Sequence, residues 1–244
     1  MTTRTFGSTA LLLVLLCAAA ACGGGTDAPE AAPPPMRSSP PVAADFVDVI
    51  DNPWMPWPVG TRWTFVGETA DGTEHTVVTV TDRTRVVDGV TTTVVRDVVH
   101  LDGKLLEDTD DWYAQDAAGN VWYFGEDTTE YAGTKADTSG SWEAGVDGAE
   151  AGIAMPAQPA VGDHYRQEYY RGEAEDEAEV LALDASASVP YGEMSGLLQT
   201  KDYTRLEPDA DEHKFYAEGV GVVLEVGLHE KDRTELVSMT HQGE

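Results

Sequence analysis

The sequence predicts an all-β protein made of two tandem antiparallel β-meander units of about 100 residues each. Short runs rich in Val, Thr, Trp and Tyr recur from residue 61 to residue 240. Pairs such as Asp88-Gly89 and Asp102-Gly103 separate several of these runs and favour tight hairpin turns. No segment combines helical spacing of apolar residues with helix caps. We expect two curved sheets that form a sandwich or close into a half-barrel or barrel-like body.

Residues 1–21 predict a secretory signal peptide. Arg4 precedes an apolar run that ends at Cys17, and four alanines follow it. The run is shorter than the roughly 20 residues that span a bilayer. Cys22 follows the alanines and precedes three glycines, as in a bacterial lipobox, so we expect acyl chains such as palmitate on Cys22. Two or more chains would hold the protein on the extracytoplasmic face of the cell membrane. The alternative is an ordinary signal peptide with an incidental cysteine.

The two cysteines, Cys17 and Cys22, leave no pair for a disulfide once the signal is removed and Cys22 is acylated. The folded part would therefore depend on its own core, which requires a chain of substantial size. Residues 22–44 are rich in Pro, Ala and Gly and predict an extended tether.

The formal charge of −29 excludes nucleic acid as an expected partner and argues against adsorption to anionic lipid. The acidic residues are scattered along the chain, which is typical of a solvated surface. They leave divalent cations or cationic partners open.

An internal repeat divides the folded part into a β unit at 45–134, a connecting loop at 135–159 and a second β unit at 160–244. Gly60 and Gly162, each in a Val-Gly pair before a run of strand character, are 102 positions apart. About the same offset relates Tyr113 to Tyr216 and Gly119 to Gly221.

Eleven runs are expected as strands. In the first unit they are 61–68, 74–82, 91–101, 104–115 and 121–125, and in the second unit 164–170, 178–184, 193–206, 212–217, 220–226 and 234–240.

The hairpin at 111–127 contains five aromatic residues and is the centre of the predicted site. We expect it to meet the loop at 139–158. Trp112, Trp122, Tyr123 and Trp142 would offer apolar surface to a small apolar molecule, a lipid or a glycan. The other interpretation of these rings is core packing.

The usual catalytic and phosphate-binding motifs are missing from the sequence. A Ca²⁺ site is a weaker expectation, since Ca²⁺ takes six to eight oxygen ligands. Its candidate ligands are Asp111, Glu126, Asp127, Glu143 and Asp147.

The order of the motifs at 52–65, 111–127, 140–149, 161–176 and 213–225 resembles a widespread group of bacterial secreted proteins and lipoproteins. The resemblance implies an extracytoplasmic location and no particular reaction, so it assigns no catalytic residue.

These observations predict a membrane-anchored lipoprotein, monomeric, that acts as a binding or accessory module for an envelope ligand. An envelope glycan hydrolase with paired carboxylates and a structural protein of the envelope are the two alternatives. A deep cleft with facing acids would favour the hydrolase, and an apolar groove would favour a carrier.

Overall fold

The computed structural model describes residues 42–229 and 232–241. Within these ranges the chain forms strands and one short 3₁₀ turn, with no α-helix, so the predicted all-β fold is confirmed. Over the same residues, no helix has the length and apolar character needed to cross a membrane. The predicted signal peptide, Cys22 and residues 23–41 of the predicted tether lie outside the described residues.

In chain order the elements are η1 (Ala43–Asp45), β1 (Phe46–Val47), β2 (Thr61–Thr69), β3 (Gly72–Val87), β4 (Val90–Leu101), β5 (Lys104–Asp116), β6 (Val121–Ala132), β7 (Lys135–Asp137), β8 (Trp142–Glu143), β9 (Glu150–Met155), β10 (His164–Arg166), β11 (Glu168–Tyr169), β12 (Asp176–Val189), β13 (Gly192–Thr204), β14 (Glu212–Ala217), β15 (Gly221–Gly227) and β16 (Arg233–His241).

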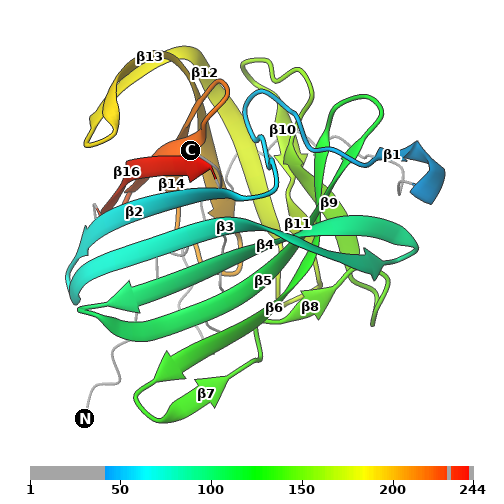
Figure 1. Cartoon of the computed structure of the whole chain (residues 1–244), viewed down its shortest axis with the longest axis horizontal. Helices are drawn as coiled ribbons and strands as arrows, with labels where there is room; N and C mark the ends of the chain where they lie inside the picture. Colours follow the sequence, from blue (N-terminus) through cyan, green and yellow to red (C-terminus); the bar gives the residue numbers. More distant parts are fainter. Residues whose placement is uncertain (1–41, 230–231, 242–244) are drawn as a thin grey trace, which may run out of the picture.

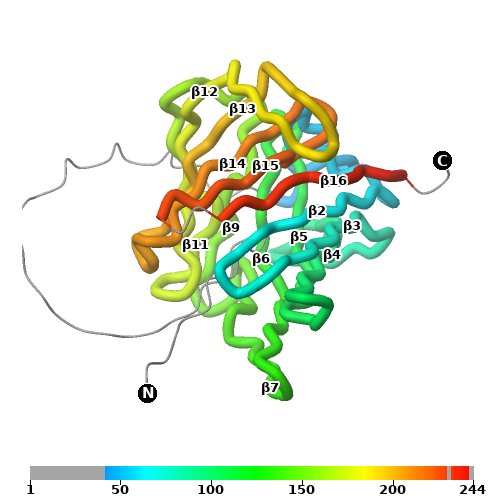
Figure 2. The backbone as a smooth tube through the Cα atoms, turned by 90° about the vertical axis from the view of Figure 1, so that its left-hand side faces the viewer, coloured from blue at the N-terminus to red at the C-terminus, as the bar shows by residue number. Residues whose placement is uncertain are grey.

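These strands form one antiparallel sheet that curls into a barrel-like body. The hydrogen-bonded order is β10-β12-β13-β14-β15-β16-β2-β3-β4-β5-β6-β9-β11. In Figure 1, β2 to β6 form a broad curved layer, and the strands of the second unit complete the body behind it. Figure 2 shows the junction between the units, where β16 lies between β15 and β2. The two predicted units therefore share one continuous sheet.

A single segment, residues 164–169, joins the two ends of the sheet into a nearly closed ring. Its first half, β10, pairs with β12, and its second half, β11, pairs with β9 at the other end of the sheet. Between them, the Gln167 backbone N–H donates to the Asp176 carbonyl at 2.8 Å. Because both edges are paired here, the sheet presents no long free edge at this point.

Tight turns connect the long strands as their sequence predicts. Asp88 and Gly89 have φ of 47° and 81°, and Asp102 and Gly103 have φ of 48° and 76°. Positive φ at both central residues gives the turn that matches the twist of a hairpin.

Residues 135–159 differ from the predicted loop, because they form β7, β8 and β9. β9 is rich in Ala and Gly and lacks the composition of a strand. It forms because β6 and β11 pair with its two edges. A Cβ on Gly152 would lie 2.3 Å from the backbone of Gln167, so this close approach requires glycine.

The segment before β2 packs over the hairpin of β5 and β6. The Asn52 backbone N–H donates to Gln115 Oε1 at 2.8 Å, and its side-chain Nδ2 donates to the carbonyls of Gly119 and Pro156. Trp57 then lies against Trp63, with ring centroids 5.2 Å apart, and against Tyr113 at 5.5 Å. The tryptophans of this segment thus extend the aromatic part of the core.

Candidate functional site

The described part of the chain buries ten carboxyl groups with one lysine. We call this set the acidic cluster, and each member is at most 9% exposed. Its acids are Glu74 (β3), Asp97 (β4), Glu107 and Asp111 (β5), Glu126 (β6), Glu168 (β11), Asp176 (β12), Asp202 (β13), Glu212 (β14) and Glu225 (β15), and its lysine is Lys214 (β14).

Strand alternation places these side chains on the inner face of the sheet. On β5, Asp111 and Tyr113 share one face, as residues two apart in a strand do. On β6, Tyr123 pairs with Tyr113 and Glu126 pairs with Asp111, because a bulge adds one residue between them. Gly125 in this bulge has φ of 117°, and a Cβ there would lie 2.2 Å from the carbonyl oxygen of Trp142. The bulge therefore turns both Tyr123 and Glu126 inward.

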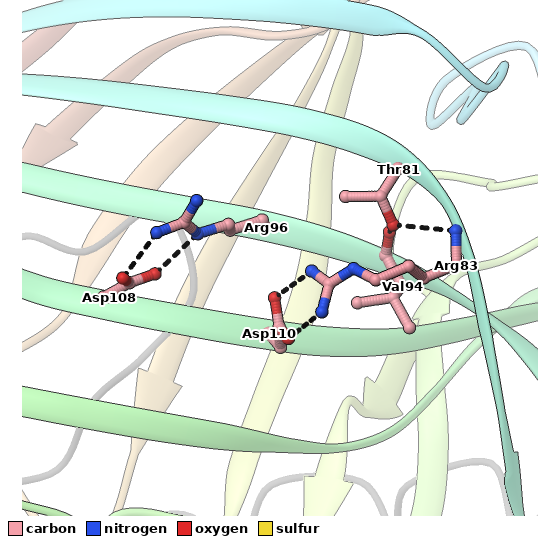
Figure 3. A network of polar contacts seen from close by, with 6 residues as sticks. All are labelled: Thr81, Arg83, Val94, Arg96, Asp108 and Asp110. Carbon is pink, nitrogen blue, oxygen red and sulfur yellow. Dashed lines mark hydrogen bonds and ion pairs between the residues drawn. The ribbon is translucent and has the colours of Figure 1, made fainter.

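On the outer face of the same strands, two aspartates form ion pairs with arginines. There Arg83 makes two hydrogen bonds of 2.6 Å with Asp110, and Arg96 binds Asp108 through bonds of 2.7 and 2.6 Å (Figure 3). These arginines are about half exposed. These two outer acids thus each have an arginine partner, whereas the ten acids inside share one lysine.

Lys214 neutralises only part of the acidic cluster. Its Nζ lies 3.1 Å from Glu212 Oε1, 3.5 Å from Asp202 Oδ2 and 3.9 Å from Glu225 Oε1. Burial lowers the pKa of the ammonium, but these three carboxylates raise it by more, so it lies above its ordinary value. Lys214 thus stays charged, and the described residues contain no other buried lysine or arginine to compensate the remaining acids.

Burial raises the pKa of most carboxyl groups in the acidic cluster. Burial raises the pKa of Glu74, Glu107 and Asp176 to about 7 and that of Asp111 to about 8. Burial, followed by neighbouring carboxylates, raises the pKa of Asp97, Glu126, Glu168 and Glu225 well above its ordinary range. Desolvation disfavours the charged form and has this effect on carboxyl groups.

Several of these groups lack hydrogen-bond partners. Neither oxygen of Glu225 accepts a hydrogen bond, and Asp111 Oδ2, Glu126 Oε2 and the Tyr113 hydroxyl are also unpaired. Each unpaired buried polar group costs about 1–3 kcal/mol. A ligand that paired with them would recover part of this free energy.

Glu168 and Asp176 form a close acid pair at the closing segment. After burial, the charge of Asp176 is the largest cause that raises the pKa of Glu168. A hydrogen bond from Glu168 in turn lowers the pKa of Asp176, which burial has raised to about 7. The two carboxyl groups therefore influence each other's protonation.

A cavity lies beside this pair. Its volume is about 40 Å³, which is enough for about three water molecules. Its walls combine aromatic and aliphatic surface with the polar groups of the closing segment and Lys214. The lining residues are Met55, Trp57, Tyr123, Ala154, Gln167, Glu168, Asp176, Lys214, Tyr216 and Val222. Trp57 Nε1, a donor, and Gln167 Oε1, an acceptor, are buried there without partners.

The four aromatic residues predicted as a ligand surface do not share one face. Tyr123 lines the cavity and stacks on Tyr113 at 5.0 Å, and Trp142 meets Tyr123 edge-on at 5.4 Å. Trp122 instead lies near Phe46, with centroids 6.5 Å apart, and Arg85 covers Trp112 at 4.0 Å. Only Tyr123 and Trp142 of the four are thus near the acidic cluster.

The five predicted Ca²⁺ ligands are also separated. Asp111 and Glu126 are buried and paired in register across β5 and β6. Asp127 is exposed, and so is Asp147 in its turn. Glu143 binds Arg85 at 2.5 Å. In residues 42–229 and 232–241 no three His, Cys, Asp or Glu side chains are arranged to hold a metal ion. The calcium site stays a prediction.

The sequence did not lead to a prediction of most of the acidic cluster, although the alternation of residues along the strands contains a signal for it. Asp97 lies between Val95 and Val99 at spacing two, and Lys214 lies between Glu212 and Tyr216. A charged residue at the inward parity of a strand indicates a buried charge. The high acid content of the whole chain hides this signal.

Comparisons with known proteins add little to this geometry. No protein-family model matches the chain, and no curated protein matches it. One solved structure, described as a "putative lipoprotein" from Parabacteroides distasonis, is similar with a TM-score of 0.40 and 12% identity over 77% of this chain and 98% of that chain. A likeness this weak assigns no function.

Proposed function

We propose that the protein is a lipid-anchored, extracytoplasmic binding module that holds a small, partly polar ligand inside its barrel. The N-terminal sequence supports the anchor through the lipobox-like pattern at Cys22. The observation that carries the binding function is the cavity, in which aromatic walls adjoin unpaired polar atoms of Trp57 and Gln167. Ligand sites combine apolar walls with a few fixed polar groups in this way.

The size of the cavity fits a small molecule better than a lipid chain or a long glycan. The cavity volume of about 40 Å³ is far below the 300–1,000 Å³ that is typical of pockets for drug-sized ligands. Met55 and Trp57, from the segment before β2, form part of the wall. A larger ligand would need this segment to move.

The acid pair does not favour the hydrolase alternative. Glycosidases hold their two carboxyl groups about 5–10 Å apart, with the sugar bond between them. Glu168 and Asp176 instead interact directly, because each carboxyl group shifts the pKa of the other. Both line the same cavity, which fits a binding site in which they face one ligand.

Native mass spectrometry of the full-length chain, purified from its own host in mild detergent, tests the proposal. We expect a bound small molecule in the wild type and its loss in Ala154→Leu, because the larger side chain fills the cavity that Ala154 lines. A bare wild-type polypeptide would contradict the proposal, and so would the same bound mass in both proteins.

A mass increment of the acylated Cys22 peptide tests the anchor in the same sample. Loss of that increment and of membrane partitioning in Cys22→Ser is the expected result. Membrane partitioning that survives this substitution would refute the anchor.

A further inference from the structure

The two β units place their inward-facing residues in equivalent positions. Gly60 and Gly162 have φ of 85° and 89°, and their backbone N–H groups donate at 2.9 Å to the carbonyls of Val80 and Val180 respectively. Gly119 and Gly221 both have φ of 97°. The sequence repeat is therefore also a repeat of backbone geometry.

The strand register extends this equivalence to the acidic cluster. In the first unit Asp111 pairs with Glu126, and Tyr113, two residues later, pairs with Tyr123. In the second unit Lys214 pairs with Glu225, and Tyr216, two residues later, pairs with Val222. A bulge separates the two pairs in both units. Asp111 is thus the structural counterpart of Lys214.

The neighbouring strand gives the same result. Asp97 pairs with Thr109 in the first unit, and Asp202 pairs with Glu212 in the second. Asp97 is thus the counterpart of Asp202, and Thr109 is the counterpart of Glu212. Three neighbouring buried acids result in each unit, at Asp97, Asp111 and Glu126 in the first and at Asp202, Glu212 and Glu225 in the second, although only two of the three positions correspond.

The two groups of three acids differ in charge compensation. The second contains the Lys214 ammonium within 3.1–3.9 Å of all three acids. The first has an acid at that position, and its unpaired atoms include Asp111 Oδ2, Glu126 Oε2 and the hydroxyl of the adjacent Tyr113, which is completely buried. Two equivalent positions are thus acidic in both units, and the position between them holds a lysine in the second unit and an acid in the first.

We propose that the first unit takes its cation from a ligand, and that this ligand is a small organic molecule with a primary ammonium group. The inference rests on the proposed binding function and names its ligand class. Tyr123 connects the two regions, because it lines the cavity and donates from its hydroxyl to Asp111 Oδ1 at 2.9 Å. Asp111 and Glu126 do not line the cavity themselves. The ammonium group therefore reaches past Tyr123 to bind them and displaces the protons that they retain, while the carbon part of the ligand lies in the cavity against Trp57 and Tyr123. Aromatic faces next to carboxylates suit an alkylammonium ion.

Calorimetry on the full-length protein tests this inference, with methylammonium, ethanolamine and butylammonium chlorides as probes. Potassium and tetramethylammonium chlorides at equal ionic strength are the controls, since neither donates hydrogen bonds. We expect saturable binding of at least one primary amine, at least ten-fold tighter than either control. Equal weak binding of all five salts would overturn the inference.

Two substitutions of Asp111 locate the site. Asp111→Lys copies the second unit, so its own ammonium should occupy the position and abolish amine binding. Asp111→Asn preserves the size of the side chain and should weaken amine binding at least ten-fold, which keeps the test valid if the lysine variant does not fold. Asp127→Asn, on the exposed face of the same hairpin, is the matched control and should bind as the wild type does. Unchanged binding in Asp111→Asn would overturn the inference.

The outcome separates this inference from the proposed function. A wild type that binds no amine, but carries another molecule that Ala154→Leu loses, would retain the binding function and refute the ligand class. A wild type that carries no molecule and binds no amine would refute both.

Discussion

At the scale of single residues, burial of many carboxyl groups is the main cost to the stability of this protein. Lys214 reduces part of this cost, because its ammonium group lies beside three of the buried acids. A buried ion pair contributes little net stability, but removal of one partner leaves the other charges uncompensated. Asp202 also accepts hydrogen bonds from Thr200 Oγ1 at 2.5 Å and from Gln167 Nε2 at 3.1 Å, so the lysine belongs to a connected network.

Lys214→Met should therefore lower the free energy of unfolding by about 3–5 kcal/mol at neutral pH. Denaturant unfolding followed by tryptophan fluorescence measures the difference. Lys201→Met is the matched control, because Lys201 is 32% exposed and its pair with Asp211, at 2.6 Å, is worth at most about 1 kcal/mol. Equal losses in the two variants would show that the buried acids do not need the lysine.

At the scale of elements, the closing segment at 164–169 decides whether the sheet is a ring. Its contact with β9 depends on Gly152, which has no room for a side chain beside Gln167. Gly152→Ala should cost about 1–3 kcal/mol through overpacking, measured by thermal or denaturant unfolding. Gly192→Ala is its control, since a Cβ there meets nothing within 4 Å, and its effect should stay below about 1 kcal/mol. If Gly152→Ala is as stable as this control, the close contact between β9 and the closing segment does not contribute to stability.

The long strands could be predicted from the sequence, because their Val- and Thr-rich alternation and their Asp-Gly turns act locally. β9 could not be predicted from the sequence, because this segment, with its Ala and Gly residues, forms a strand only by pairing with β6 and β11. The whole fold brings these two strands together. The candidate site was predicted only at Asp111, Glu126, Tyr123 and Trp142. Its remaining members come from strands far apart in sequence, and their inward direction depends on bulges such as that at Gly125.

At the scale of the whole molecule, the acidic cluster makes stability depend on pH. The folded protein retains protons on groups such as Glu107 and Asp111, with pKa values of about 7 and about 8, which the unfolded chain releases near pH 4. Their contribution is complete below about pH 4 and is lost as the pH rises to about 8. The free energy of unfolding should fall over this range, by about 1.4 kcal/mol per pH unit for each retained proton.

Guanidinium unfolding at about pH 5, 6.5 and 8 measures this slope. Asp111→Asn removes one titrating group and should make the slope shallower, whereas Asp127→Asn should leave it unchanged because Asp127 is exposed. A free energy of unfolding that rises between pH 5 and pH 8 would contradict the prediction.

The pairing of β16 with β2 has a consequence for how the chain reaches this structure. Thr61 on β2 and His241 on β16 are register partners although 180 positions separate them. A ribosome releases β2 well before β16, so one edge of β2 has no neighbour until residues 233–241 have been made. Exposed strand edges recruit other chains into aggregates. A nascent chain of this protein thus exposes this edge of β2 for a long interval, and a chain that stops before residue 233 exposes it permanently.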